Sequence, residues 1–125
     1  MVYEYDATAD RWTKKKPIPV PVHHQAQTEY NGKIYVFGGC QRPLAGPGAG
    51  GWEPVDNSWE YTPATDTWRA LAPMPGKRCS AVAGAVGGKI YVIGGAAIME
   101  NSGETALFGN RPARVLGTNQ AYDPA

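Results

Sequence analysis

The chain has 125 residues, enough for one domain of ordinary size. Twelve Lys and Arg residues face eleven Asp and Glu residues, so the net charge of +1 gives no long-range attraction to nucleic acid or anionic membranes. No stretch approaches the roughly 20 apolar residues of a membrane span, and the N-terminal residues lack the basic and apolar regions of a signal peptide. The sequence predicts neither an anchor nor a leader and leaves the compartment open.

Glycine (16 residues) and proline (11 residues) are frequent and follow no collagen-like period. They separate runs that are rich in Val, Ile, Tyr and Trp, which predicts many short β-strands joined by turns. No apolar period of 3.6 residues persists for ten residues, so no helix is expected.

The predicted strands are, in chain order, 2–6, 11–16, 24–30, 33–39, 57–62, 67–72, 80–86, 89–95 and 119–123. The sequence also repeats itself along this order. "NGKIYVFGG" at 31–39 returns as "GGKIYVIGG" at 87–95, a shift of 87 − 31 = 56 residues, and a third copy begins with "NQAYDPA" at 119–125. The alignment of 2–39 with 58–95 needs no gap, and its identical pairs include Glu4 and Glu60, Tyr5 and Tyr61, Asp10 and Asp66, and Trp12 and Trp68. Such a period is the signature of a repeat architecture.

Each unit reads as four short antiparallel strands, the last two joined by a turn at "TPATDT". One sheet of this size cannot bury both of its faces and needs a neighbour on each side, as a propeller blade does. The order Gly-Gly, variable loop, Tyr, about six residues, Trp resembles the kelch repeat. The resemblance, notably to the kelch proteins common in bacteria, covers most of the chain. It implies an all-β fold of kelch β-propeller blades.

The expected organisation is a single kelch-repeat unit over 1–125. Residues 1–16 form the outer half of a blade, 17–72 one complete blade, and 73–125 most of a further blade. About two blades leave apolar sheet faces open. Two explanations stay open: the chain is a fragment of a longer propeller, which the duplicated positions of 3–8 and 120–125 favour, or three identical chains close a ring of about six blades.

In kelch propellers, partners usually meet the face that carries two sets of loops. Here these sets are 40–56 with 96–118, and 17–23 with 73–79. The loops 40–56 and 96–118 are long. We expect both to be structureless, and structureless loops of such length are typical of functional or disordered segments. The candidate binding residues on this face are Arg42, Trp52, Glu100, Arg111 and Arg114. Arg78 precedes an inner strand, where it either reaches the channel mouth or bonds to loop carbonyls between blades.

His23 and His24 are further binding candidates on this face. As neighbours on a strand they are expected to point to opposite sides, which makes them a poor chelating pair, and no metal or other cofactor is predicted. Cys40 and Cys79 fall on the same face, where a disulfide is conceivable. The sequence favours two free thiols.

The resemblance implies a binding or scaffold module that presents its loops to a protein, peptide or glycan, rather than an enzyme. The alternative is a fragment of a kelch-type sugar-active enzyme, similar to sialic-acid mutarotases or to galactose oxidase. The copper ligand set of the oxidases cannot be placed here, because the tyrosines occupy structural columns of the repeat. A mutarotase would need an acid and a base in a sugar pocket, such as Arg78 with Glu29 or Glu100. A purely structural blade pair is a third reading.

Overall fold

The structure, a computed structural model, describes residues 1–42, 52–98, 107–108 and 111–125. These residues form strands and one 3₁₀ turn, η1 (Pro63–Thr65), and they contain no helix with the length and hydropathy of a membrane span. The all-β class is confirmed. All nine predicted strands are present, and each boundary lies within two residues of its expected place.

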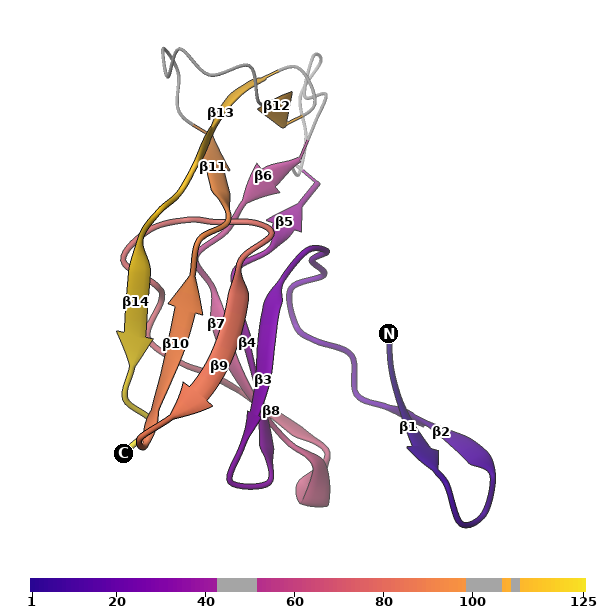
Figure 1. Cartoon of the computed structure of the whole chain (residues 1–125). Coiled ribbons are helices and arrows are strands. Elements are labelled where there is room, and N and C mark those ends of the chain that lie inside the picture. The colour runs from indigo at the N-terminus through magenta and orange to yellow at the C-terminus, as the bar shows by residue number, and fades with distance from the viewer. Residues whose placement is uncertain (43–51, 99–106, 109–110) are drawn as a thin grey trace.

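The main sheet has four antiparallel strands in the order β3 (Ala26–Tyr30), β4 (Lys33–Phe37), β7 (Ser58–Thr62) and β8 (Thr67–Ala70). A second sheet places β10 (Lys89–Ile93) between β9 (Val82–Val86) and β14 (Asn119–Tyr122). The N-terminal strands β1 (Val2–Asp6) and β2 (Arg11–Lys15) form a hairpin that stands apart from both sheets (Figure 1).

The repeated Tyr, Asp and Trp residues shape the outer hairpin of each unit. Asp66 adopts a left-handed φ of 50° after η1, and its carboxylate accepts a hydrogen bond from the Tyr61 hydroxyl at 2.9 Å. The Tyr61 ring lies 4.8 Å from that of Trp68, centroid to centroid. Among residues that carry a side chain, Asp and Asn tolerate this backbone conformation best, which explains an Asp at the turn.

The core lies between the two larger sheets, which stack with β3 beside β9 (Figure 1). Its buried members are Ala26, Tyr35, Phe37, Met74, Ile90 and Val92. Alternation along β4 and β10 supplies Tyr35, Phe37, Ile90 and Val92, because successive residues of a strand point to opposite faces. Ala83 of β9 and Ala81, directly before it, pack against this core, so small side chains along the inner strand let the sheets approach.

The double glycine after β4 sits where two backbones meet. Gly38 has a φ of 60°, and a Cβ there would lie 2.5 Å from the carbonyl oxygen of Arg78. The same crowding occurs at Gly95, where a Cβ would lie 2.4 Å from the carbonyl oxygen of Cys79. The repeat therefore needs glycine both for its left-handed φ and for the close approach.

Candidate binding face

The two long loops carry strands of their own, so the expectation that they are structureless is wrong. β5 (Cys40–Gln41) pairs with β6 (Glu53–Pro54), while β13 (Arg111–Val115) pairs with both β11 (Ala96–Ile98) and β12 (Leu107–Phe108). These short strands lie beyond one end of the two larger sheets, at the top of Figure 1. We call this end of the molecule the loop face. Ladder hydrogen bonds hold its described parts in place.

The disulfide Cys40–Cys79 lies at the base of the loop face, so the expectation of two free thiols is wrong. The Cα atoms of the two residues are 5.4 Å apart, an ordinary span for a disulfide, and both side chains are buried. Cys40 also pairs through its backbone with His23, and Cys79 with Ala96. The bond thus joins the end of β4 in one sheet to the approach to β9 in the next.

His23 and His24 face each other, which corrects the expectation that they point to opposite sides. His24 has a φ of 55°, and this left-handed residue interrupts the alternation of the strand. The Nδ1 atoms of the two rings lie 2.5 Å apart, a hydrogen bond in which one ring donates. Burial, together with the nearby charge that His24 can carry, lowers the pKa of His23. Ser80, 56 residues later, has a φ of 58°, so the kink belongs to the repeat.

Trp52 completes a small aromatic group with the histidine pair. Its ring meets that of His23 edge to face, with centroids 4.0 Å apart. The Trp52 side chain remains 43% exposed. A large ring that is held at one edge and open to solvent suits contact with a peptide or a sugar.

Arg78 lies inside the molecule and is 2% exposed. Its Nη1 donates to the carbonyl oxygens of Gly94 and Thr118 at 3.0 and 3.3 Å, and its Nη2 donates to the Thr118 hydroxyl at 2.9 Å. The sequence left two roles open for Arg78: reaching the channel mouth or bonding to loop carbonyls. These distances match the second role. Arg78 ties the linker before β9 to the segment before β14.

The remaining candidates sit at the edges of this region. Arg42 is exposed directly after β5, and Arg114 is exposed on β13 opposite Ala97. Glu100 and the side chain of Arg111 lie outside the described residues. Glu29, proposed as an acid or base, sits near the opposite end of β3, where its carboxylate accepts the N–H of Gly32 at 2.8 Å. The described residues therefore do not bring Arg78 and Glu29 together.

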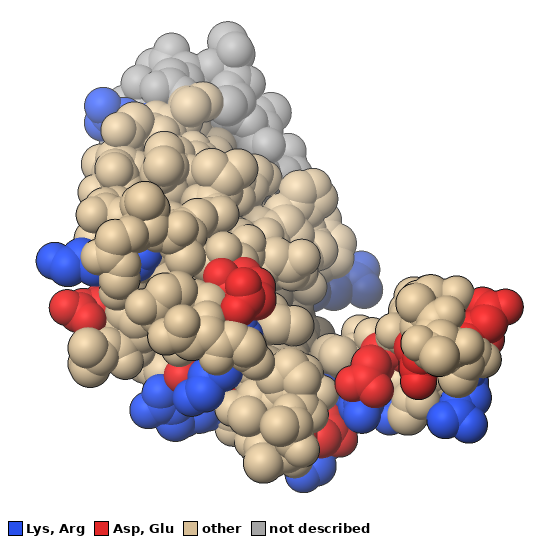
Figure 2. All heavy atoms as spheres, turned by 60° about the horizontal axis from the view of Figure 1, so that its bottom comes forward, with Lys and Arg blue, Asp and Glu red and all other residues tan. Residues whose placement is uncertain are grey.

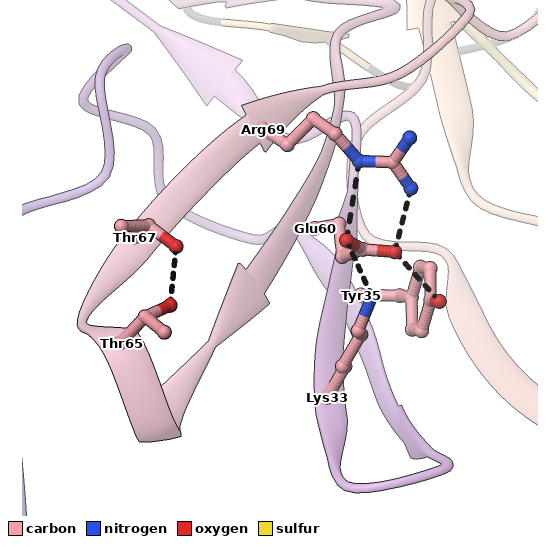
Figure 3. Close-up of polar contacts among 6 residues, drawn as sticks. All are labelled: Lys33, Tyr35, Glu60, Thr65, Thr67 and Arg69. Atoms are coloured by element: carbon pink, nitrogen blue, oxygen red, sulfur yellow. Dashed lines mark hydrogen bonds and ion pairs between the residues drawn. The ribbon is translucent and has the colours of Figure 1, made fainter.

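Sequence reasoning missed one charged cluster, which centres on Glu60 in β7 (Figure 3). Arg69 donates to its two carboxylate oxygens from Nε and Nη2 at 3.2 and 2.8 Å. Lys33 donates at 3.0 Å and Tyr35 at 2.9 Å. The signal was present in the sequence, because Lys33 and Glu60 are both identical between repeats, but only the strand register shows that they meet.

The cluster is built to keep Glu60 ionised. The paired Arg69, supported by Lys33 and Tyr35, lowers the pKa of Glu60 to about 2 against the opposing effect of burial. Burial and the Glu60 carboxylate raise the pKa of Tyr35 to about 12. With its acceptor sites filled, Glu60 joins β4, β7 and β8 rather than serving as an acid or base. In Figure 2, which turns the hairpin ends forward, Lys and Arg intermingle with Asp and Glu instead of forming a patch of one sign.

A four-stranded antiparallel sheet with this Gly-Gly, Tyr and Trp pattern, stacked face to face on a second antiparallel sheet, is the arrangement of β-propeller blades. A family model described as Kelch motif matches residues 28–75. The chain belongs to the kelch-repeat family.

Relatives occur in several kingdoms. The chain is 33% identical over 94 residues to an F-box/kelch-repeat protein of Arabidopsis thaliana, covering 75% of this chain and 23% of that protein. It is 34% identical over 99 residues to the Kelch-like protein terF of Aspergillus terreus, covering 78% and 21%. It is 39% identical over 67 residues to the N-acetylneuraminate epimerase of Pasteurella multocida, covering 52% and 17%.

The solved structure of YjhT is similar to this fold, with a TM-score of 0.65 and 27% identity over 76% of this chain and 28% of that one. The chain thus spans less than a third of this structure and less than a quarter of the Arabidopsis and Aspergillus relatives.

Proposed function

We propose that this chain is a binding or scaffold module that presents its loop face to a protein, peptide or glycan. The observation that carries the proposal is the Trp52 ring, exposed beside the ordered strands β5 and β6 and held at one edge by His23. A rigid amphipathic ring loses little conformational entropy when a partner covers it. Arg42 and Arg114 add exposed positive side chains that suit acidic groups on such a partner.

A peptide display library and a glycan array would test the proposal. Ligands selected on the intact chain are expected to bind the Trp52→Ala variant at least about tenfold more weakly, since an aromatic anchor is worth 1.4 kcal/mol or more. Trp12→Ala is the matched control, because Trp12 is the same residue type and even more exposed, at 66%, but lies on the β1–β2 hairpin. Equal losses in the two variants would contradict a site at the loop face.

We further propose that the chain works as part of a larger propeller or of one completed by self-association. The proposed units are the outer half of a blade in 1–16, one blade in 17–72 and most of a further blade in 73–125. Three chains would then close a ring of about six blades. Light scattering behind a sizing column tests the ring: a trimer would support it, and a monomer would leave only the larger polypeptide.

A sugar-active enzyme is the second candidate, favoured by the resemblance to the N-acetylneuraminate epimerase. Against this candidate, the Arg78 guanidinium already donates to carbonyl groups, and Glu29 lies near the end of β3 that is remote from the loop face. Exchange between the two anomers of N-acetylneuraminate, followed by NMR, separates the candidates. Accelerated exchange would favour the mutarotase, and a copper-dependent oxidation would favour the oxidase. Binding without either reaction would favour the module.

A further inference from the structure

The outward face of β9 and β10 is apolar and uncovered in the described structure. Val82, Val86 and Ile93 are 63%, 66% and 48% exposed. Their counterparts 56 residues earlier are Ala26, Tyr30 and Phe37, which pack in or against the core between the two sheets. The chain therefore shows, at an equivalent place, what such a face packs against: the inner strands of another blade.

The β1–β2 hairpin is a structural copy of β7–β8. Tyr5 donates to Asp10 at 2.7 Å and its ring lies 4.9 Å from that of Trp12, as Tyr61 does with Asp66 and Trp68. β7, however, pairs with β4, whereas β1 pairs only with β2 among the described residues. Beside β1 lies a cavity of about 410 Å³, bounded by residues 1–3 on one side and by the outward side chains of β3 and β4 on the other. These include Gln27, Ile34 and Val36, and Gln25, directly before β3, extends the same wall.

Charge complementarity connects the sheet of β9 and β10 with the β1–β2 hairpin. In the complete sheet Glu60 stands opposite Tyr35 and binds Lys33 and Tyr35. β10 repeats this arrangement with Lys89 and Tyr91, but Ala121 of β14 stands opposite Tyr91. The carboxylate at the matching repeat position belongs to Glu4 of β1, since 60 − 56 = 4.

We propose that the β1–β2 hairpin of a second copy of this chain pairs with β10 in the place of β14. The repeat sets the register: Tyr5 opposite Ile90, Glu4 opposite Tyr91, Tyr3 opposite Val92 and Val2 opposite Ile93. Glu4 of the second copy then binds Lys89 and Tyr91, and β9, β10, β1 and β2 form one four-stranded blade. The apolar face of β9 and β10 fills the cavity beside β1 of the second copy, against its Ile34 and Val36.

This inference rests on the self-association arm of the proposed function and specifies its joint. The contact is heterologous, because different surfaces of the two copies meet, so growth stops only when the ring closes. β14 competes with the hairpin for the same edge of β10 and has the advantage of belonging to the same chain. The hairpin offsets this advantage with a second strand and with the rings of Tyr5 and Trp12.

Directed crosslinking tests the register. A Val2→Cys chain mixed with an Ile93→Cys chain keeps Glu4, Lys89 and Tyr91 and is expected to form an intermolecular 2–93 disulfide, mapped by peptide mass spectrometry alongside the native Cys40–Cys79 bond. The control is Lys15→Cys with Ile93→Cys, because Lys15 lies opposite Val2 on β2, one strand farther out. At least about tenfold more product is expected from the first pair, since a disulfide requires Cβ atoms about 4 Å apart.

A second variant tests the competition from β14. Ala121→Glu gives β14 the missing carboxylate and is expected to weaken association at least tenfold by sedimentation, while Ala121→Gln has a smaller effect. An oligomer without the 2–93 crosslink would overturn the hairpin exchange and leave self-association standing. A monomer at every concentration would overturn both, and would assign the open face to further blades of a longer polypeptide. Peptide or glycan binding at the loop face is scored separately in each case.

Discussion

Cys40 and Cys79 are joined across consecutive blades, at the point where the backbone of Cys40 also pairs with His23. The disulfide encloses a sequence separation of 39 residues that contains β6, β7 and β8. It therefore closes a loop around the two outer strands of the complete blade, links the end of β4 to the approach to β9, and fixes the base of the loop face.

Removing this disulfide is expected to destabilise the chain. A Cys40→Ser, Cys79→Ser double variant should lose about 2–4 kcal/mol of unfolding free energy, because the unfolded chain regains the entropy of the closed loop. Urea titration followed by tryptophan fluorescence measures the loss. As a companion measurement, alkylation of the native protein should modify neither cysteine until a reductant is added; ready labelling of both would show that the bond is not formed.

Glu60→Gln is expected to cost about 1–3 kcal/mol, since it weakens charge-assisted hydrogen bonds while Arg69 and Lys33 can partly return to water. Glu4→Gln is the matched control, at the same repeat position but with an exposed carboxylate paired to Lys15. Its measured cost should be under about 0.5 kcal/mol in the monomeric chain. Similar losses in the two variants would contradict the special role of burial at Glu60.

Stability is expected to fall at low pH through Glu60. Its pKa is about 2 in the folded protein against an ordinary value of 4.5, so folding favours the ionised form. The contribution is complete above pH 4.5 and is lost as the pH falls from there through 2. Urea midpoints between pH 2 and 6 measure this slope, which should be shallower in Glu60→Gln. An unchanged slope in that variant would assign the acid sensitivity to other groups.

Gly38→Ala is expected to destabilise the chain more than Gly32→Ala. Both glycines have a positive φ, of 60° and 73°, so each substitution incurs about 1–2 kcal/mol of backbone strain. At Gly32 the new Cβ meets open space, whereas at Gly38 it clashes with the Arg78 carbonyl and with Met74. The difference between the two unfolding free energies isolates the close approach between blades, and equal losses would argue against it.

Local patterns were sufficient for the strands of the blades. Alternation and β-branched residues located β4 and β10, the 56-residue period located β1 as the equivalent of β7, and the likeness of "NQAYDPA" to "NSWEYTPA" located β14. These signals lie within a few neighbouring residues or recur at a fixed spacing, so a single sequence contains them. The Gly and Pro content of the long loops hid β5, β6, β11, β12 and β13, because such short strands are formed by their partners rather than by intrinsic preference.

The sequence by itself determined the kelch blades, their repeat and the loops that gather at one face. Only the tertiary structure decided that Cys40 meets Cys79, that the left-handed backbone of His24 turns its ring toward His23, and that Arg78 donates to carbonyl groups. It likewise decided that Glu60 collects partners from β4 and β8. Three of these contacts depend on distances between segments far apart in the chain, and the histidine pair depends on a single backbone angle, and composition and periodicity encode neither.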